Sequence, residues 1–213
     1  MVIHILERIH KKIIKSRDIP WYVRILLLPL SWLNQGIVYM DKTEKIFKLI
    51  SDVIITIGIF LMVHTKFQNV TDSLLISILL AHTLNWIFNS NISALLRNFN
   101  ITKMTTETLQ VYLDRLSKKA ENEKSILWVG VYGSLVRGKF KETSDLDVRI
   151  IRKPGFINGV RACVFVMEER IWATFNKFPL DIYVGDNSRF LEKMSNEESP
   201  IIIKGDANEI PTK

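Results

Sequence analysis

The sequence lacks the features that mark secreted or repetitive proteins. Its 213 residues contain one cysteine, Cys163, so no internal disulfide can form. That cysteine lies in an apolar run, residues 160–167, which is typical of a small buried side chain in a reducing compartment. There is no internal repeat or low-complexity tract, and charges interrupt the apolar residues near the N-terminus where a cleaved signal peptide needs a hydrophobic core. We therefore expect a protein of the reducing cytoplasm without a cleaved leader.

The hydrophobic and the basic residues are unevenly distributed along the chain. Hydrophobic residues make up 47% of the chain, enough to fill a core, and they concentrate between residues 19 and 99. The net charge is +7, and residues 1–48 hold nine Lys and Arg residues against four acids. This concentration of positive charge near the N-terminus favours an anionic membrane surface as a partner. A nucleic-acid-binding protein is not indicated, because the sequence has no pattern of basic residues interleaved with aromatic ones.

Residues 1–48 are predicted to form a basic amphipathic or interfacial segment. Within it, residues 1–17 place apolar side chains near one helical face and basic side chains toward another, as in helices that lie on anionic lipid. An ordinary surface helix packed on its own protein remains the alternative. An apolar stretch, residues 25–33, is too short to span a bilayer and suits its interface; Trp21 and Tyr22 precede it, and Trp32 lies near its end.

Residues 49–100 are predicted to form a two-helix transmembrane hairpin. The apolar segments 49–64 and 73–88 are each slightly shorter than the roughly 17 to 25 residues of a spanning helix, unless flanking residues extend them. Their linker carries Lys66 as its only full positive charge, whereas the outer flanks carry several: Lys42, Lys45 and Lys48 before, and Arg97 and Lys103 after. By the positive-inside rule both ends are cytoplasmic, and so is the domain that follows. A soluble hairpin buried against a partner remains open, because polar residues lie within or beside the apolar runs.

Residues 101–213 have the mixed composition of a soluble domain. A helix is expected over residues 105–122, followed by a buried strand at 126–132 that runs into Gly133-Ser134. The glycine permits a tight turn, and the N–H groups that follow it, with the Ser134 hydroxyl, can hold a terminal phosphate. Arg137 and Lys139 lie just beyond and either neutralise phosphate charge or are solvated loop cations.

Two carboxylates follow this turn. Asp145 and Asp147 lie two positions apart on a second predicted strand, so their side chains point to one face. Carboxylates this close repel each other unless a cation lies between them, and their hard oxygen atoms suit Mg²⁺, with Mn²⁺ as a substitute. Asp181, in the short apolar strand 180–184, is the candidate third carboxylate of a two-metal site, because an unpaired acid there would be costly.

The remaining segments are predicted from their residue pattern alone. After the turn at Pro154-Gly155, residues 157–178 have helical spacing, interrupted by β-branched residues around Val164 and Val166. A short helix is expected near residues 189–194, and residues 200–203 form an apolar run before a polar tail.

The pattern of Gly133, Ser134, Asp145, Asp147 and Asp181 resembles the motif of the nucleotidyltransferase superfamily typified by DNA polymerase beta. The resemblance covers roughly residues 105–205 and implies an α+β fold, with a small mixed sheet and helices, here preceded by an all-α membrane region. It also implies Mg²⁺-dependent transfer of a nucleoside monophosphate from a triphosphate to an acceptor, with release of pyrophosphate. In such a site Asp145 and Asp147 bind both metal ions, Asp181 binds the catalytic one and helps deprotonate the acceptor, and Gly133 and Ser134 hold the outer phosphates.

Only about 30 residues follow Asp181, so the further helical domain of template-directed members is not expected, and neither is a nucleic-acid template. The acceptor site would then be built by the hairpin, a second subunit or a partner. A membrane location favours a lipid, a lipid-linked glycan or a membrane protein as acceptor. Two alternatives remain: an antitoxin-like transferase that modifies a partner protein, and a membrane-tethered nucleotide sensor or scaffold without turnover.

Overall fold

The computed structural model describes residues 20–67, 69–187, 191, 199–206 and 208. The chain divides into two compact units, Met1–Asn34 and Gln35–Lys213. In the first unit the described element is helix α2 (Trp21–Asn34), which exposes aromatic and aliphatic side chains along its length. The amphipathic helix expected over residues 1–17 lies outside the described residues, and so does most of the short helix expected near residues 189–194.

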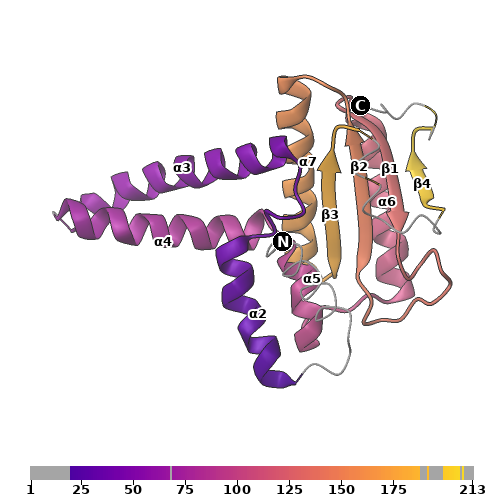
Figure 1. Cartoon of the computed structure of the whole chain (residues 1–213), viewed down its shortest axis with the longest axis horizontal. Coiled ribbons are helices and arrows are strands. Elements are labelled where there is room, and N and C mark those ends of the chain that lie inside the picture. The colour runs from indigo at the N-terminus through magenta and orange to yellow at the C-terminus, as the bar shows by residue number, and fades with distance from the viewer. Residues whose placement is uncertain (1–19, 68, 188–190, 192–198, 207, 209–213) are drawn as a thin grey trace, which may run out of the picture. The chain divides into compact units, whose positions relative to one another are not determined.

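The second unit begins with a helical hairpin made of α3 (Lys42–His64) and α4 (Val70–Phe88), which pack against each other (Figure 1). Asp41 caps α3 and Asn69 caps α4, each through a side-chain oxygen that accepts a backbone N–H of the first turn. The helices are 23 and 19 residues long, which is longer than the two apolar segments alone indicate.

The hairpin is polar inside and apolar outside. The buried residues of α4 are Ser73, Ser77, Ala81 and Asn85, and those of α3 are Glu44 and Lys48. Aliphatic side chains cover the outer surface, among them Leu49, Ile50, Val53, Ile54, Ile57, Leu61, Leu74, Leu75, Ile78, Leu79 and Leu80. A water-soluble helix has the opposite arrangement. Both helices are long and apolar enough to cross a membrane.

A short connection leads from the hairpin to a mixed α+β domain. It contains α5 (Ile92–Leu96) and the 3-10 helix η1 (Arg97–Phe99). The elements that follow are α6 (Thr106–Asn122), β1 (Ile126–Tyr132), β2 (Leu146–Arg152), α7 (Phe156–Phe175), β3 (Leu180–Gly185) and β4 (Ile201–Lys204). The strands form one sheet in the order β3-β2-β1-β4, in which β2 and β3 are parallel and the other pairs antiparallel. The expected small mixed sheet is confirmed.

Helices α6 and α7 cover one face of this sheet (Figure 1). The hydrophobic core lies between these helices and the sheet, where Leu146, Val148 and Ile150 of β2 pack with Leu116 of α6 and Val166 of α7. Because strand side chains alternate, the odd-numbered residues of β2 point to the opposite face. That face carries the candidate site.

The observed elements differ from the expected ones in two places. Residues 200–203 were expected only as an apolar run, but residues 201–204 form the edge strand β4 against β1. The helical pattern after Gly155 was expected to be interrupted around Val164 and Val166, yet α7 is continuous. Val166 is fully buried in the core, and this burial outweighs the weak helix preference of β-branched residues.

One buried side chain, Arg170 of α7, connects the hairpin to the sheet. Its Nη2 donates to Glu44 of α3 at 2.6 Å and to the Ile182 carbonyl of β3 at 2.8 Å. Its Nε donates to the Asn91 amide oxygen at 3.0 Å, and its Nη1 lies 3.4 Å from the oxygens of Asn89. The Arg170 and Glu44 side chains are 1% and 2% exposed, so each depends on the other for compensation of its charge.

We expect the substitution Arg170→Met to lower the free energy of unfolding by about 3 to 5 kcal/mol, because it removes the ion-pair partner of the buried Glu44 carboxylate. The melting temperature of the full chain in detergent should fall by roughly 6 to 20 °C. Arg161→Met on the same helix is the matched control, since its ion pair with Glu123 is exposed and contributes little. Equal shifts for the two variants would contradict this role for Arg170.

Candidate active site

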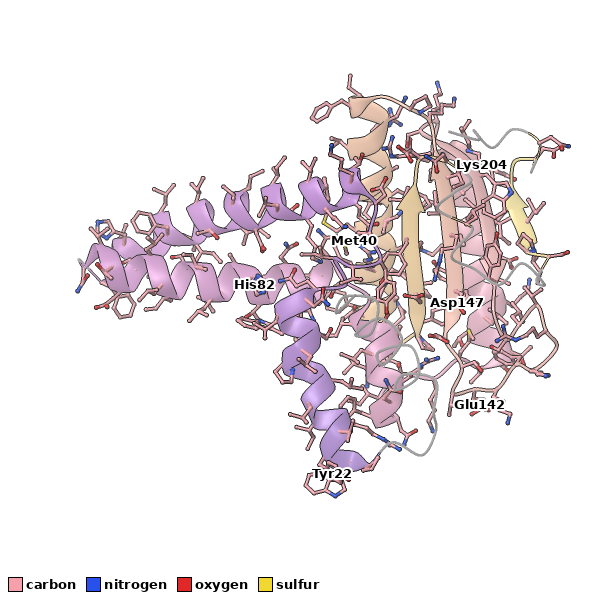
Figure 2. All side chains as sticks on the ribbon, in the orientation of Figure 1. Tyr22, Met40, His82, Glu142, Asp147 and Lys204 are labelled. Atoms are coloured by element: carbon pink, nitrogen blue, oxygen red, sulfur yellow. The ribbon has the colours of Figure 1, made fainter. Side chains whose placement is uncertain are left out.

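The three acidic residues predicted to form the site lie together on the open face of the sheet. Strands β2 and β3 are parallel, and their register pairs Asp147 with Asp181, so both side chains point to one face. Asp145 immediately precedes β2 and points the same way, two positions before Asp147. Figure 2 labels Asp147 on the sheet, where its neighbours are Tyr132 of β1 and Asp181 of β3.

The carboxylates are half-buried and lie close to one another, and this affects their protonation. Burial raises the pKa of Asp147 well above its ordinary value, and the nearby charges of Asp145 and Asp181 raise it further, although Arg149 opposes them. Burial also raises the pKa of Asp145, against the effect of Arg97. A cation placed among these groups would relieve their repulsion and favour their ionised forms.

Arg149, which sequence reasoning missed, lies among these carboxylates. Its Nη2 donates to Asp181 at 2.8 Å and lies 3.5 Å from Asp147. Its Nη1 donates to the Val148 and Asp181 carbonyls, each at 2.8 Å, and its guanidinium lies over the Tyr183 ring at 5.1 Å. The signal for it was present, because Arg149 follows Asp147 by two positions on the same strand.

Two further site residues come from the connection after the hairpin. Asn91 donates from its amide nitrogen to Asp181 at 2.8 Å, while its amide oxygen accepts from Arg170. Arg97 of η1 forms an ion pair with Asp145. Both residues lie far before the motif in sequence and carry no recognisable pattern, so only the tertiary structure reveals them.

The turn after β1 has the backbone geometry that a glycine permits. Gly133 has a φ of +86°, and a Cβ at this position would overlap the Asp147 carboxylate. The Ser134 hydroxyl is buried and has no hydrogen-bond partner among the described residues, so it is available to a ligand. Arg137 and Lys139 occupy exposed positions of the same turn. The turn that begins at Gly133-Ser134 is predicted to hold phosphate and is called the phosphate turn below. It lies next to the carboxylates.

The donor set suits a divalent cation in its chemistry. Asp145, Asp147 and Asp181 offer hard carboxylate oxygens on one face, and their mutual repulsion gives a cation a favourable place. Within the described part of the chain, no three acidic, histidine or cysteine side chains are already arranged around a metal position. Two of the three carboxylates have an arginine as partner: Arg149 binds Asp181, and Arg97 binds Asp145.

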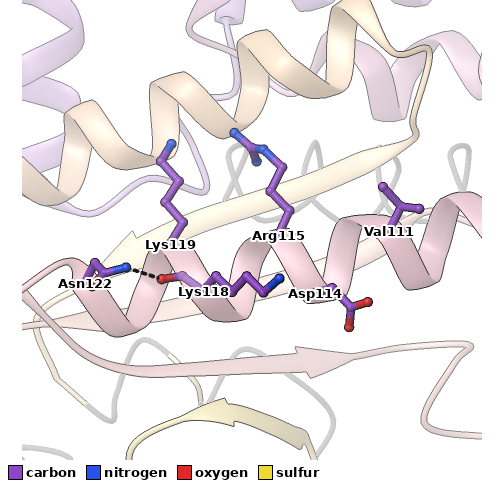
Figure 3. Close-up of a pocket in the computed structure, with 6 residues that line it drawn as sticks. All are labelled: Val111, Asp114, Arg115, Lys118, Lys119 and Asn122. Carbon is purple, nitrogen blue, oxygen red and sulfur yellow. Dashed lines mark hydrogen bonds between the residues drawn. The ribbon is translucent and has the colours of Figure 1, made fainter.

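A separate surface hollow lies along α6 and is lined by Val111, Asp114, Arg115, Lys118, Lys119 and Asn122 (Figure 3). The opposite side of α6, which includes Leu116, packs on the sheet face away from the carboxylates. This hollow is therefore not part of the candidate active site.

We expect Gly133→Ala to displace the Asp147 carboxylate and to lower the melting temperature of the full chain, because the added Cβ meets that side chain in a left-handed backbone. The matched control is Gly138→Ala in the same turn, which has a φ of +63° but open space around the position. The control should lower the free energy of unfolding by about 1 to 2 kcal/mol, from backbone strain alone. A Gly133→Ala variant no less stable than Gly138→Ala would contradict the close approach.

Comparison with known proteins agrees with this geometry. Residues 113–201 match the family model described as a nucleotidyltransferase domain. No curated protein and no solved structure matches the chain. The matched segment contains the phosphate turn, all three acidic residues and Arg149, whereas Asn91 and Arg97 precede it. The chain therefore carries, at residues 113–201, a nucleotidyltransferase domain of the superfamily that its motif indicated.

Proposed function

We propose that this chain is a membrane-anchored, metal-dependent nucleotidyltransferase. It would move a nucleoside monophosphate from a nucleoside triphosphate to an acceptor hydroxyl and release pyrophosphate. The observation that carries this proposal is the contact between the phosphate turn and the carboxylates, where Gly133 lies against Asp147 and the buried Ser134 hydroxyl is available to a ligand. A site of this kind works by positioning and charge stabilisation.

The residues have distinct roles in this reaction. Asp145 and Asp147 would hold Mg²⁺ together with Asp181, and Mn²⁺ can replace it. The bound ion would neutralise phosphate charge and polarise the phosphorus that is attacked. Gly133 and Ser134 would bind the outer phosphates through backbone N–H groups and the serine hydroxyl.

Asp181 would orient the acceptor and receive its proton. The acceptor oxygen then bonds to the α-phosphorus while the bond from this phosphorus to the bridging oxygen breaks, and pyrophosphate leaves. Asn91 donates to one carboxylate oxygen of Asp181 and Arg149 donates to the other, which fixes the direction of the carboxylate. Arg137 and Lys139, at exposed positions of the turn, would offset the charge of the leaving pyrophosphate.

The outer surface of the hairpin supports a bilayer as its surroundings. An α-helix rises 1.5 Å per residue, so the 23 and 19 residues of α3 and α4 extend about 34 and 28 Å, close to the roughly 30 Å of a hydrocarbon core. Their exposed side chains are largely aliphatic, and their polar groups face inward. The excess of basic residues at the outer ends supports a cytoplasmic position for the catalytic domain, where nucleoside triphosphates are found.

The short stretch of chain between the end of α4 and the contact with Asp181 supports an acceptor at the membrane surface. Asn91, which contacts Asp181, follows Phe88 by three positions, and three residues of extended chain span at most about 11 Å. The polar zone of one leaflet is itself about 5 to 8 Å deep. A lipid, a lipid-linked glycan or a membrane protein could therefore present its hydroxyl to Asp181 more readily than a soluble acceptor could.

We expect Asp147→Asn to reduce pyrophosphate release by at least about 1,000-fold, because the substitution removes a charge that the metal–triphosphate complex requires. The measurement is pyrophosphate release by the full chain in membranes, with Mg²⁺ and each of the four triphosphates. Asp114→Asn on the exposed side of α6 is the matched control and should leave the rate unchanged. Tight triphosphate binding by the wild-type chain without any pyrophosphate release would favour a nucleotide sensor instead.

We also expect a cysteine at the hairpin tip, introduced as Lys66→Cys, to react with a membrane-impermeant maleimide added outside intact cells. Lys66 is exposed in the turn between the two helices. Lys118→Cys on the catalytic domain should react only after the membrane is permeabilised. The native Cys163 is buried, so the unaltered chain serves as the unlabelled control. Labelling of both positions only after permeabilisation would contradict a spanning hairpin and favour one that packs on a partner.

A further inference from the structure

Two guanidinium groups contact the carboxylates, and they are held in different ways. Arg149 projects from a central strand, donates to two backbone carbonyls and to Asp181, and lies over the Tyr183 ring. Its side chain is 10% exposed. A group held by several contacts inside a strand stays in place, so Arg149 is a permanent countercharge of the site.

Arg97 lies outside the sheet, in the connection that follows the hairpin. It begins η1, and its guanidinium pairs with Asp145. The segment around it is anchored on both sides of the arginine: Ser93 lies against the Leu180 carbonyl at 3.4 Å, and Thr102 donates to the Ser93 carbonyl at 2.8 Å. The backbone of Arg97 is thus fixed near the site, and its side chain, which is 14% exposed, reaches Asp145 through several rotatable bonds.

The charge of the site changes when the substrate arrives. With all three carboxylates ionised, the site including Arg97 and Arg149 has a net charge of −1, and without Arg97 the net charge is −2. A divalent cation competes with Arg97 for Asp145, since both need the same carboxylate. Once Asp145 turns to the cation, Arg97 loses its partner inside a partly buried site, and the incoming triphosphate supplies new anionic oxygens beside it.

We propose that Arg97 occupies Asp145 in the substrate-free protein and becomes a ligand of the triphosphate when Asp145 binds the metal ion. This inference rests on the proposed function and assigns the same site a phosphate-binding residue from outside the matched domain. A guanidinium suits this exchange because its planar fork binds carboxylate and phosphate alike, by two parallel hydrogen bonds. The position suits it too, because Asp145 lies two residues from Asp147, which touches the phosphate turn at Gly133.

The exchange makes binding of the metal and of the triphosphate mutually dependent. A metal ion alone must displace Arg97 and leave its charge uncompensated, so it binds weakly. A metal ion with a triphosphate offers Arg97 a replacement partner, so the pair binds together. The segment that joins the hairpin to the catalytic domain therefore controls when the carboxylates are free.

The test uses the full chain in detergent micelles and two separate titrations. Mn²⁺ alone is titrated and followed by electron paramagnetic resonance. The α,β-methylene analogues of the four triphosphates, which cannot transfer a nucleotide, are then titrated by calorimetry at saturating Mg²⁺. Arg97→Ala should bind Mn²⁺ alone about 5- to 10-fold more tightly, and should bind the preferred analogue roughly 10- to 100-fold more weakly.

Two further variants make the result specific. Arg161→Ala removes an exposed arginine of α7 and should change neither affinity. Arg97→Lys keeps the charge but loses the planar fork, so its Mn²⁺ affinity should stay near that of the wild type while its analogue affinity falls several-fold. This variant also decides the question if Arg97→Ala melts at a much lower temperature than the wild type.

The outcomes separate the inference from the function on which it rests. Unchanged analogue affinity in both Arg97 variants would overturn the inference and leave the proposed function standing. Tighter binding of both Mn²⁺ and the analogue by Arg97→Ala would also overturn it, since Arg97 would then only block the site. A wild-type chain that binds neither Mn²⁺ nor any analogue would overturn the inference and the proposed function together.

Discussion

The arrangement of the second unit depends on the buried guanidinium of Arg170. A charged group in a low-dielectric interior is costly unless its donors are satisfied, and Arg170 meets this requirement with acceptors from α3, the residues after α4, and β3. No single one of these segments supplies enough acceptors. The hairpin, its connection and the sheet must therefore come together for the charge to be compensated, which makes their packing cooperative.

The same group links the hairpin to the candidate active site. Arg170 fixes the amide oxygen of Asn91, and this leaves the amide nitrogen of Asn91 directed at Asp181. The parallel register of β2 and β3 then sets Asp181 beside Asp147. A domain that could be regarded as a minimal catalytic unit thus takes part of its active-site geometry from residues that precede the matched region. The hairpin and the connection after it therefore help to build the candidate site.

The sequence was informative where the relevant signal is local. Alternation of side chains along β1 and β2, and the two-residue spacing of Asp145 and Asp147, predicted both the strands and the shared direction of the carboxylates. Arg149 obeys the same alternation and could have been found. Edge strand β4 could not, because four residues give little periodicity and its pairing with β1 is distant in sequence. The contact of Arg97 with Asp145 depends on how a connecting segment folds back, which no local pattern encodes.

The small residues along the inner side of α4 have a consequence for substrate choice. Ser73, Ser77 and Ala81 recur every fourth position and let α3 approach closely, so that the hairpin is a stiff paired rod joined to the catalytic domain through buried contacts. In the proposed membrane setting a rod of this kind would hold the carboxylates at one height above the lipid. Hydroxyl groups at that height would be within reach, and those nearer to or farther from the membrane would not. A transferase without a separate acceptor domain would in this way select its acceptor by the distance of the acceptor hydroxyl from the membrane surface.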